Sequence, residues 1–521
     1  AEQVKELLVS IFRQADPETG QGPDLTAGEI LAAGAKRVET ELAREPRIQA
    51  ELLDAIAQIQ GSLGQFDPAA EAASTALARR RALFGAESVP VAQSLTTLAE
   101  LAANRGRLEE AIRLAERAGP AFERHAGPES PDRQRLDRVR VFLLRHQAEP
   151  ERALALVEEL LEANRRHFGP TSVQTARLLI NRAEVLGDLS RFAEAEQAVR
   201  QALAILEASP QVTRLEVSYA RRGLADLLES LDRHQEAAAE FDAVLALQRA
   251  ELGPRHRQVA FTRIAQGFLL SEMRRFPEAE ATLREAIRIL EPLDHFEIGS
   301  ARCYLGICMM SQERYAEAER QFSEAERFLR TKLEADHPLV WGSRISQGIA
   351  QLRLGRLGEA RRTLSEVVDH YARTEPESDG NRSALKHLGE VAWREGRIDE
   401  ALALHRQARQ IEVKIFGTEK HVGVAFSDYL IALDLLARGD PGSLAEARQR
   451  IDAAIAVLRH ENAGHPTLNR FLLASGRIAL AVGDEARARQ DLTDAVARLR
   501  GFRGPDHPDT REAEALLRRA S

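Results

Sequence analysis

The sequence of 521 residues predicts an all-α fold, a solenoid of about eleven helical hairpins. One small residue, always alanine, returns behind a corner at successive spacings of 42, 42, 42, 42, 42, 39, 42, 41, 46 and 41 residues. These alanines are Ala69, Ala111, Ala153, Ala195, Ala237, Ala279, Ala318, Ala360, Ala401, Ala447 and Ala488. Aromatic residues make up 5% of the chain and alternating patterns are nowhere sustained, which favours helices over strands.

Each copy is predicted to contain two helices. In residues 92–106 of the second copy, apolar side chains recur at the three- and four-residue spacing of a helix with one buried stripe. Gly106 ends that helix, and residues 111–122 show the same spacing after a corner with acidic residues, which the helix dipole favours there. The copy is therefore expected to form an antiparallel helical hairpin.

Two further columns of small residues mark where helices are expected to touch. The first helix carries Ala57, Ala99, Ala183, Ala225, Gly267, Gly306, Gly348, Gly389 and Gly476, and the second carries Ala76, Ala118, Ala202, Ala286, Ala325, Ala408, Ala454 and Ala495. Small side chains let helix backbones approach closely, so a bulky replacement would overpack the contact at a cost of roughly 1–3 kcal/mol.

These columns, around corners such as Arg275-Phe276, resemble the tetratricopeptide repeat. The period near 42 residues, with Phe-Gly, Leu-Gly or His-Pro pairs between copies, is similar to the kinesin-light-chain subtype. The resemblance covers residues 46–502 and implies a right-handed superhelix that holds a partner in its concave groove. The third copy, with Glu149-Pro150 at its corner, and the tenth, with extra residues 440–442, depart from the pattern, so we expect local irregularity at both.

Residues 1–45 do not fit the repeat, and we interpret them as an N-terminal linker with capping helices. We expect one helix over residues 4–12 and another that begins with a capping box of Thr26 and Glu29. Residues 7–42 are also similar to the segment that precedes such repeats in bacterial serine/threonine protein kinases. That resemblance implies a catalytic domain upstream, often with a membrane span between, and the chain begins at Ala1 without a methionine. At the other end, residues 503–521 are expected to form a C-terminal capping helix.

Charge and cysteine content narrow the setting. The formal net charge is -8, and acidic and basic residues are interleaved along the predicted helices, which is typical of a solvated surface and disfavours a nucleic-acid partner. Cys303 and Cys308 lie five residues apart on one predicted helix, so they point to different faces and favour a reducing, cytoplasmic compartment. The sequence has no apolar run of membrane-spanning length, so any membrane tether is expected in an upstream segment.

The sequence indicates no catalytic, cofactor or metal site. A protein kinase needs a glycine-rich phosphate loop and H-R-D and D-F-G sequences, and His405-Arg406 is followed by Gln407 where the aspartate would stand. His460 and His465 lie close together, but His465-Pro466 belongs to the repeating linker pairs, which we expect to set loop geometry. The chain itself is therefore expected not to be an enzyme.

The concave face carries the candidate binding site. By the family's geometry, the groove-facing positions are mostly polar in copies one to five, including Arg222 and Asp226, and turn apolar in copies six to eight. The apolar positions are Phe261, Ile264, Phe268, Cys303, Ile307, Met310, Ile345, Ile349 and Leu352, followed by Lys386 and Trp393 in copy nine. A contiguous apolar stripe on a solvent-facing surface usually marks a contact. The alternative is that superhelical curvature buries these positions against neighbouring repeats.

Two functions are consistent with these features. The first is a partner-binding scaffold, the regulatory region of a bacterial signalling protein, with a protein segment or peptide laid along the groove. The second is a sensor whose apolar section encloses a small ligand or signal peptide. A small molecule that raises the melting temperature would favour the sensor.

Overall fold

The structure, a computed structural model, describes residues 27–62, 65–127, 130–147, 149–462 and 467–520. These residues form α-helices and one short 3-10 helix, and no strand occurs among them, so the predicted all-α fold is confirmed. The helix expected over residues 4–12 and the N-cap residue Thr26 lie outside the described residues. The chain divides into two compact units, of which the first ends at Gly253 and the second begins at Pro254.

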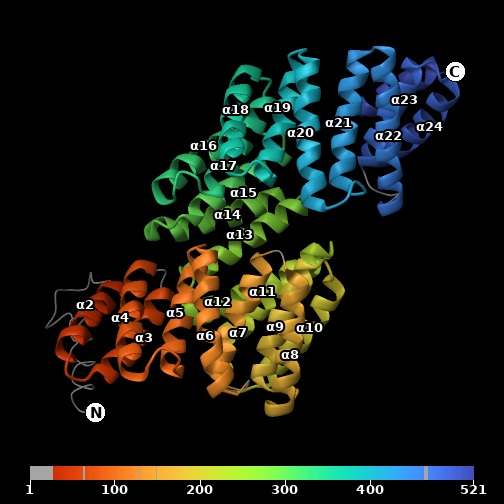
Figure 1. Cartoon of the computed structure of the whole chain (residues 1–521). Coiled ribbons are helices and arrows are strands. Elements are labelled where there is room, and N and C mark those ends of the chain that lie inside the picture. The colour runs from red at the N-terminus through yellow and green to blue at the C-terminus, as the bar shows by residue number, and fades with distance from the viewer. Residues whose placement is uncertain (1–26, 63–64, 128–129, 148, 463–466, 521) are drawn as a thin grey trace. The chain divides into compact units, whose positions relative to one another are not determined.

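In each unit the helices follow one another as antiparallel neighbours (Figure 1). The first unit contains α2 (Ala27–Glu41), α3 (Pro46–Ser62), α4 (Phe66–Phe84), α5 (Val89–Asn104), α6 (Leu108–His125), α7 (Pro131–His146), α8 (Pro150–Phe168), α9 (Val173–Asp188), α10 (Phe192–Ala208), α11 (Arg214–Ser230) and α12 (His234–Leu252). The second contains α13 (Arg257–Glu272), α14 (Phe276–Leu290), η1 (Glu291–Leu293), α15 (Glu297–Ser311), α16 (Tyr315–Lys332), α17 (Pro338–Arg353), α18 (Leu357–Thr374), α19 (Asp379–Arg394), α20 (Ile398–Phe416), α21 (Val422–Arg438), α22 (Pro441–Asn462), α23 (Thr467–Ala481), α24 (Glu485–Arg503) and α25 (Pro508–Arg519).

The predicted hairpins are present, and their ends fall close to the expected positions. The first copy begins with α3 at Pro46, and α25 lies within the expected C-terminal segment. Consecutive helices pack as hairpins throughout, from α3 with α4 to α23 with α24. The division at Gly253 was not anticipated from the sequence, but an array held together by neighbour contacts can divide between any two hairpins.

The small-residue columns lie where the helices touch. All eleven corner alanines are fully buried. An added Cβ would come within 2.6 Å of Leu283 at Gly267, within 2.6 Å of Phe322 at Gly306 and within 2.7 Å of Leu364 at Gly348. In each case the neighbour belongs to the second helix of the same hairpin, so the predicted contact is confirmed.

The corners adopt a left-handed backbone conformation whether or not they contain glycine. Gly106 and Gly355 have φ angles of 74° and 76°, and Arg274 and Glu313 hold the same corner position at 59° and 61°. Residues other than glycine rarely adopt this conformation because their Cβ comes too close to a backbone carbonyl oxygen, so the corners at Arg274 and Glu313 are strained.

The same type of ion pair, which we call a rung, recurs between successive copies. The corner arginine of one copy reaches the glutamate that follows the corner alanine of the copy before it, in Arg233–Glu196 (2.7 Å), Arg314–Glu280 and Arg356–Glu319 (3.0 Å). The charges are exchanged in later copies, where Arg448 follows the corner alanine and pairs with Asp484 (2.7 Å), and Arg361 pairs with Glu395.

Histidines begin several helices. The Nδ1 atoms of His256, His295, His337, His421 and His507 each accept a hydrogen bond from the backbone N–H two residues later, over 3.0–3.2 Å. Proline follows at the first helical position of α17 and α25. The expected role of the His-Pro pairs in setting the start of the next helix is therefore confirmed at those two helices, whereas His465 lies outside the described residues.

The two copies expected to be irregular depart from the pattern in different ways. The tenth copy departs from the pattern in the length of its second helix, because the extra residues lengthen α22, which begins at Pro441 after Asp440 accepts a hydrogen bond from the Ser443 N–H (3.0 Å). The third copy does depart from the pattern. Its α7 buries the carboxylate of Asp137, which is 2% exposed and ion-paired with Arg140 (3.4 Å). Burial raises the pKa of Asp137 despite the arginines beside it.

Candidate functional site

The first helices of successive hairpins touch one another on one side of the stack. In the second unit α13 contacts α15, α15 contacts α17, and α17 contacts α19, in addition to the contacts within each hairpin. In the first unit the same holds from α3 through α11. Because neighbouring elements come closest on the inner side of a curved stack, these helices form its inner face.

The predicted apolar stripe lies on three of these helices, α13, α15 and α17, and we call it the apolar floor. Six of its nine side chains are half-buried, namely Phe261, Phe268, Cys303, Ile307, Met310 and Ile349. Ile264 and Ile345 are 6% and 7% exposed, and Leu352 is fully buried in a core with Leu364 and Leu388. The floor is therefore neither wholly open nor wholly core, and Leu352 supports it from beneath without reaching solvent.

Side chains of adjacent helices join across the floor. Phe268 of α13 packs against Tyr304 of α15 with ring centroids 5.2 Å apart. The Cys303 thiol of α15 lies 3.1 Å from the Ser343 hydroxyl of α17. Burial raises the pKa of Cys303 to about 11, so the thiol stays protonated and unreactive. These contacts make the three helices one continuous surface.

The polar positions predicted at the two ends belong to helices other than those of the floor. Arg222 and Asp226 belong to α11 of the first unit, where they pair with each other at 3.4 Å. Lys386 and Trp393 belong to α19 and line a cleft beyond the floor.

This cleft, which we call the α19–α21 cleft, has a volume of about 450 Å³. Its cationic lining consists of Arg353, Arg382, Lys386, Arg394 and Arg470, and its apolar lining of Trp393, Phe426, Tyr429, Leu430 and Leu433. Trp393 is 43% exposed, and Arg470 of α23 is exposed and makes no ion pair with a described side chain. Tyr429 is held by stacking on Phe471, with ring centroids 4.7 Å apart.

Two carboxylates organise the cations of the cleft. Glu390 pairs with Arg353 (2.6 Å) and Arg394 (2.9 Å). Burial opposes ionisation of Glu390, but His387 and the two arginines outweigh it and lower the pKa to about 2. Glu412 of α20 is fully buried and accepts from Arg382 (2.9 Å) and Lys386 (2.8 Å). Arg382 also pairs with Asp379 (2.6 Å), so four cations of this wall share three carboxylates and positive charge remains in excess.

A buried histidine and a buried aspartate lie at the base of the cleft. His405 is 2% exposed and Asp434 is 1% exposed, and the His405 Nδ1 lies 2.6 Å from an Asp434 carboxylate oxygen. The other ring nitrogen faces the Lys386 carbonyl at 3.1 Å. Because both partners are acceptors, one proton lies between ring and carboxylate whichever group carries it. Burial raises the pKa of Asp434, while the hydrogen bond to His405 opposes that shift.

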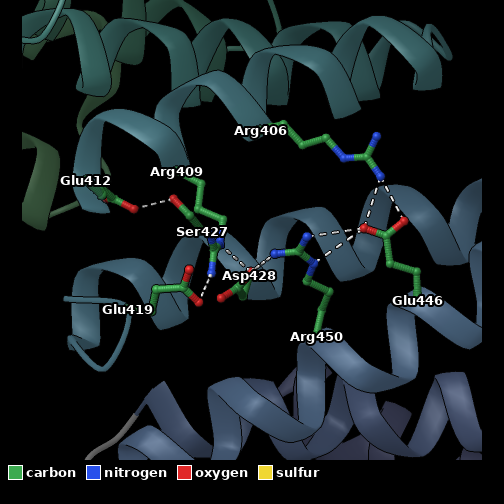
Figure 2. A network of polar contacts seen from close by, with 8 residues as sticks. All are labelled: Arg406, Arg409, Glu412, Glu419, Ser427, Asp428, Glu446 and Arg450. Atoms are coloured by element: carbon green, nitrogen blue, oxygen red, sulfur yellow. Dashed lines mark hydrogen bonds and ion pairs between the residues drawn. The ribbon is translucent and has the colours of Figure 1, made fainter. Parts of the chain in front are cut away.

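Figure 2 shows the polar network that joins the helices behind this wall, α20, α21 and α22. Asp428 of α21 accepts from Arg409 of α20 and from Arg450 of α22, each at 2.7 Å. The second oxygen of Glu412 accepts from the Ser427 hydroxyl at 2.5 Å. The network fixes the three helices relative to one another, so the carboxylate that holds the cleft cations is itself held in place.

Sequence reasoning missed most of the cleft. In the sequence, His405 stands out only as part of an incomplete kinase motif, and no pattern singles out Arg470 or Asp434. The sequence does contain a signal for this site. The residue sixteen positions after the small residue of the first helix is large and apolar in several copies, namely Leu283, Phe322, Leu364 and Leu492, and each contacts that small residue. In the copy with Gly389, the same position is His405. A histidine in a column of large apolar residues marks this hairpin as different.

Within the described residues no group of three or more His, Cys, Asp or Glu side chains is arranged to hold a metal ion. None of the described helices combines the length and apolar character needed to cross a membrane.

A stack of antiparallel hairpins with buried small-residue corners defines a helical-repeat solenoid. Family models described as Tetratricopeptide repeat match residues 91–132, residues 135–208 and 216–291, and residues 345–411. These parts of the chain are tetratricopeptide repeats. Such repeats generally mediate protein–protein interaction, and their scaffold is typically non-catalytic.

Solved structures with similar folds include repeat proteins of several kinds. Kinesin-light-chain TPR-like repeats of Podosopora anserina are 20% identical, cover 40% of this chain and 97% of their own, and give a TM-score of 0.35. A tetratricopeptide repeat protein from Parabacteroides merdae is 16% identical over 57% of this chain and 99% of its own, with a TM-score of 0.40. The apo form of RapI is 11% identical over 71% of this chain and 99% of its own, with a TM-score of 0.47. No curated protein sequence matches the chain significantly.

Proposed function

We propose that the chain is a non-catalytic scaffold that holds a segment of a partner protein, or a peptide, against the apolar floor of its second unit. The observation that carries this proposal is the half-buried state of Phe261, Phe268, Ile307, Met310 and Ile349 on three contacting inner helices. Exposed contiguous apolar side chains on a rigid surface are the usual anchor points of a protein contact.

The anchor positions are Phe268 and Ile307, because they lie near the middle of the floor. Truncating an anchor of this kind typically weakens binding by 2 kcal/mol or more, while rim positions lose little. The test is capture of a partner from the source organism, followed by affinity measurement for Phe268→Ala and Ile307→Ala. Leu293→Ala serves as the matched control, since Leu293 is 51% exposed on η1 outside the floor. Normal partner affinity in both floor variants while they stay folded would contradict the proposal.

We also propose that this scaffold is the regulatory region of a bacterial signalling protein and works in the cytoplasm beside a serine/threonine kinase domain. The support is the resemblance of residues 7–42 to the segment that precedes repeats in such kinases. Reading the codons upstream of Ala1 tests this directly. Purified chain should transfer no phosphate from ATP to a generic substrate, and transfer that one point mutation within the chain abolishes would overturn the non-catalytic assignment.

A further inference from the structure

We infer that the α19–α21 cleft is a binding site for a small organic anion, a molecule with a carboxylate or phosphate head and an aromatic body. This site is separate from the apolar floor and does not depend on it. Three features of the cleft carry the inference: the gap from which it arises, the charge of its wall and the shape of its apolar side.

The gap is a local exception in the repeat. α17 packs on α19 and α21 packs on α23, but α19 and α21 lack the extensive direct packing that joins the other inner helices of the second unit. The space between them reaches down to His405 of α20, the second helix of the hairpin, and to Asp434 of α21. Its volume of about 450 Å³ falls within the usual range of small-molecule sites.

Polar side chains lie at the base of the gap, whereas other hairpins have an apolar side chain at the corresponding position. The place of His405 is taken by Leu364 in the preceding hairpin and by Leu492 two hairpins later. Replacing leucine by a buried histidine that needs a buried aspartate costs desolvation, which a purely structural contact does not require. The pair shares one proton and adds no net charge, so the surrounding side chains determine the charge of the cleft.

Those side chains are mostly cationic. Five cations line the cleft, and the carboxyl groups on the lining are Glu390 and Asp434, of which Asp434 shares a proton with His405. Arg353 and Arg394 share Glu390, so neither has a carboxylate to itself, and Arg470 of α23 also lines the cleft. Guanidinium groups bind carboxylate and phosphate through paired hydrogen bonds, so an anionic head placed among these arginines is well matched.

The body of the ligand is set by the apolar side of the cleft. Trp393 presents an indole that is 43% exposed, and Phe426 and Tyr429 line the side formed by α21. The Phe426 ring has the Lys386 ammonium 4.8 Å from its centroid and the Tyr429 ring 5.7 Å away, so aromatic surface lies next to positive charge on this side. A flat ring fits between the indole and these side chains, with its charged head toward the arginines.

The test is isothermal titration calorimetry of the full chain with 1-naphthyl phosphate and with 1-naphthoate, which separates the two kinds of head. Inorganic phosphate supplies the head alone and 1-naphthol the body alone. We expect saturable binding of at least one naphthyl anion, at least tenfold tighter than either fragment. Binding of neither anion, or equal binding by inorganic phosphate, would overturn the inference.

Two variants locate the site. Arg470→Ala and Trp393→Ala alter exposed side chains and should each weaken binding of the tighter naphthyl anion at least tenfold, with unchanged melting of the free protein. Arg320→Ala is the matched control, because Arg320 is an exposed arginine of α16 outside the cleft. The inference is wrong if Arg320→Ala and Arg470→Ala weaken binding equally. Phe268→Ala should leave the affinity for the anion unchanged. The proposal of an anion site in the cleft can therefore fail independently of the proposal of a partner site on the apolar floor.

Discussion

Replacing Gly306 by alanine tests the helix contact that the small-residue columns create. Gly306 lies inside α15, where an added Cβ would be 2.6 Å from Cε1 of Phe322 and 2.8 Å from its Cζ. Carbon atoms in contact are normally about 3.5–4.0 Å apart, so the ring must move by about 1 Å. Phe322 is 1% exposed within the core, so the backbones of α15 and α16 must take up the movement.

The expected magnitude comes from two opposing effects. Alanine stabilises a helix interior by about 1 kcal/mol relative to glycine, whereas overpacking a core costs about 1–3 kcal/mol. Gly342 in α17 isolates the first effect, because an added Cβ there would meet nothing within 4 Å. We therefore expect Gly342→Ala to raise the free energy of unfolding by about 1 kcal/mol, and Gly306→Ala to be about 1–3 kcal/mol less stable than Gly342→Ala.

Urea unfolding followed by circular dichroism measures the difference, and hydrogen exchange locates it. Because each hairpin contacts only its neighbours, exchange should quicken in α15, α16 and the helices beside them while distant hairpins stay protected. Gly306→Leu should enlarge the effect and separate an early unfolding step. If Gly306→Ala gains as much stability as Gly342→Ala, the contact assigned to this column does not constrain the hairpin.

Three other perturbations have defined outcomes. Burial lowers the pKa of His256 and His295 below the usual 6.5, and nearby Arg257 lowers both further, so the folded state keeps the two helix-capping rings neutral. The stability that these two rings contribute is therefore complete above about pH 6.5 and falls as the pH drops below that value. Thermal melts between pH 7.5 and pH 5 can follow this loss. Glu412→Ala leaves Lys386 without a carboxylate and Arg382 with Asp379 alone, and it should lower the free energy of unfolding by about 3 kcal/mol, whereas an unchanged urea midpoint would show the pairs to be dispensable. Glu313→Gly relieves the left-handed corner at a cost in chain entropy, so the melting temperature should stay within a few degrees of the parent and not collapse as it would for a glycine placed in mid-helix.

The sequence predicted the fold well because the repeat states each packing constraint many times. Ala111 alone would be an ordinary helical alanine, but eleven alanines in register reveal a buried corner. The same register predicts that Gly306 packs against a second helix, and Phe322 is the side chain it meets there. Helix ends within each copy followed from the same register.

The site was predicted less completely, because it depends on where the repeat is broken. The apolar floor was found from groove positions, yet Leu352 is buried and Ile264 nearly so, since burial depends on how closely neighbouring helices approach. The α19–α21 cleft arises from the loss of one helix contact, and no residue type marks that loss. His405 was visible in the sequence, but its meaning required knowing that Gly389 faces it.

The rungs of ion pairs between copies give each junction a direction. A copy with Glu196, Glu280 or Glu319 after its corner alanine requires an arginine from the next copy, whereas a copy with Arg448 there requires an acid such as Asp484. Exchanging copies joined through the first kind of rung therefore keeps this ion pair at each junction. Grafting the copy that starts at α23 behind Glu319 would instead set two carboxylates face to face, so the charge order of the rungs restricts which rearrangements of this chain remain stable.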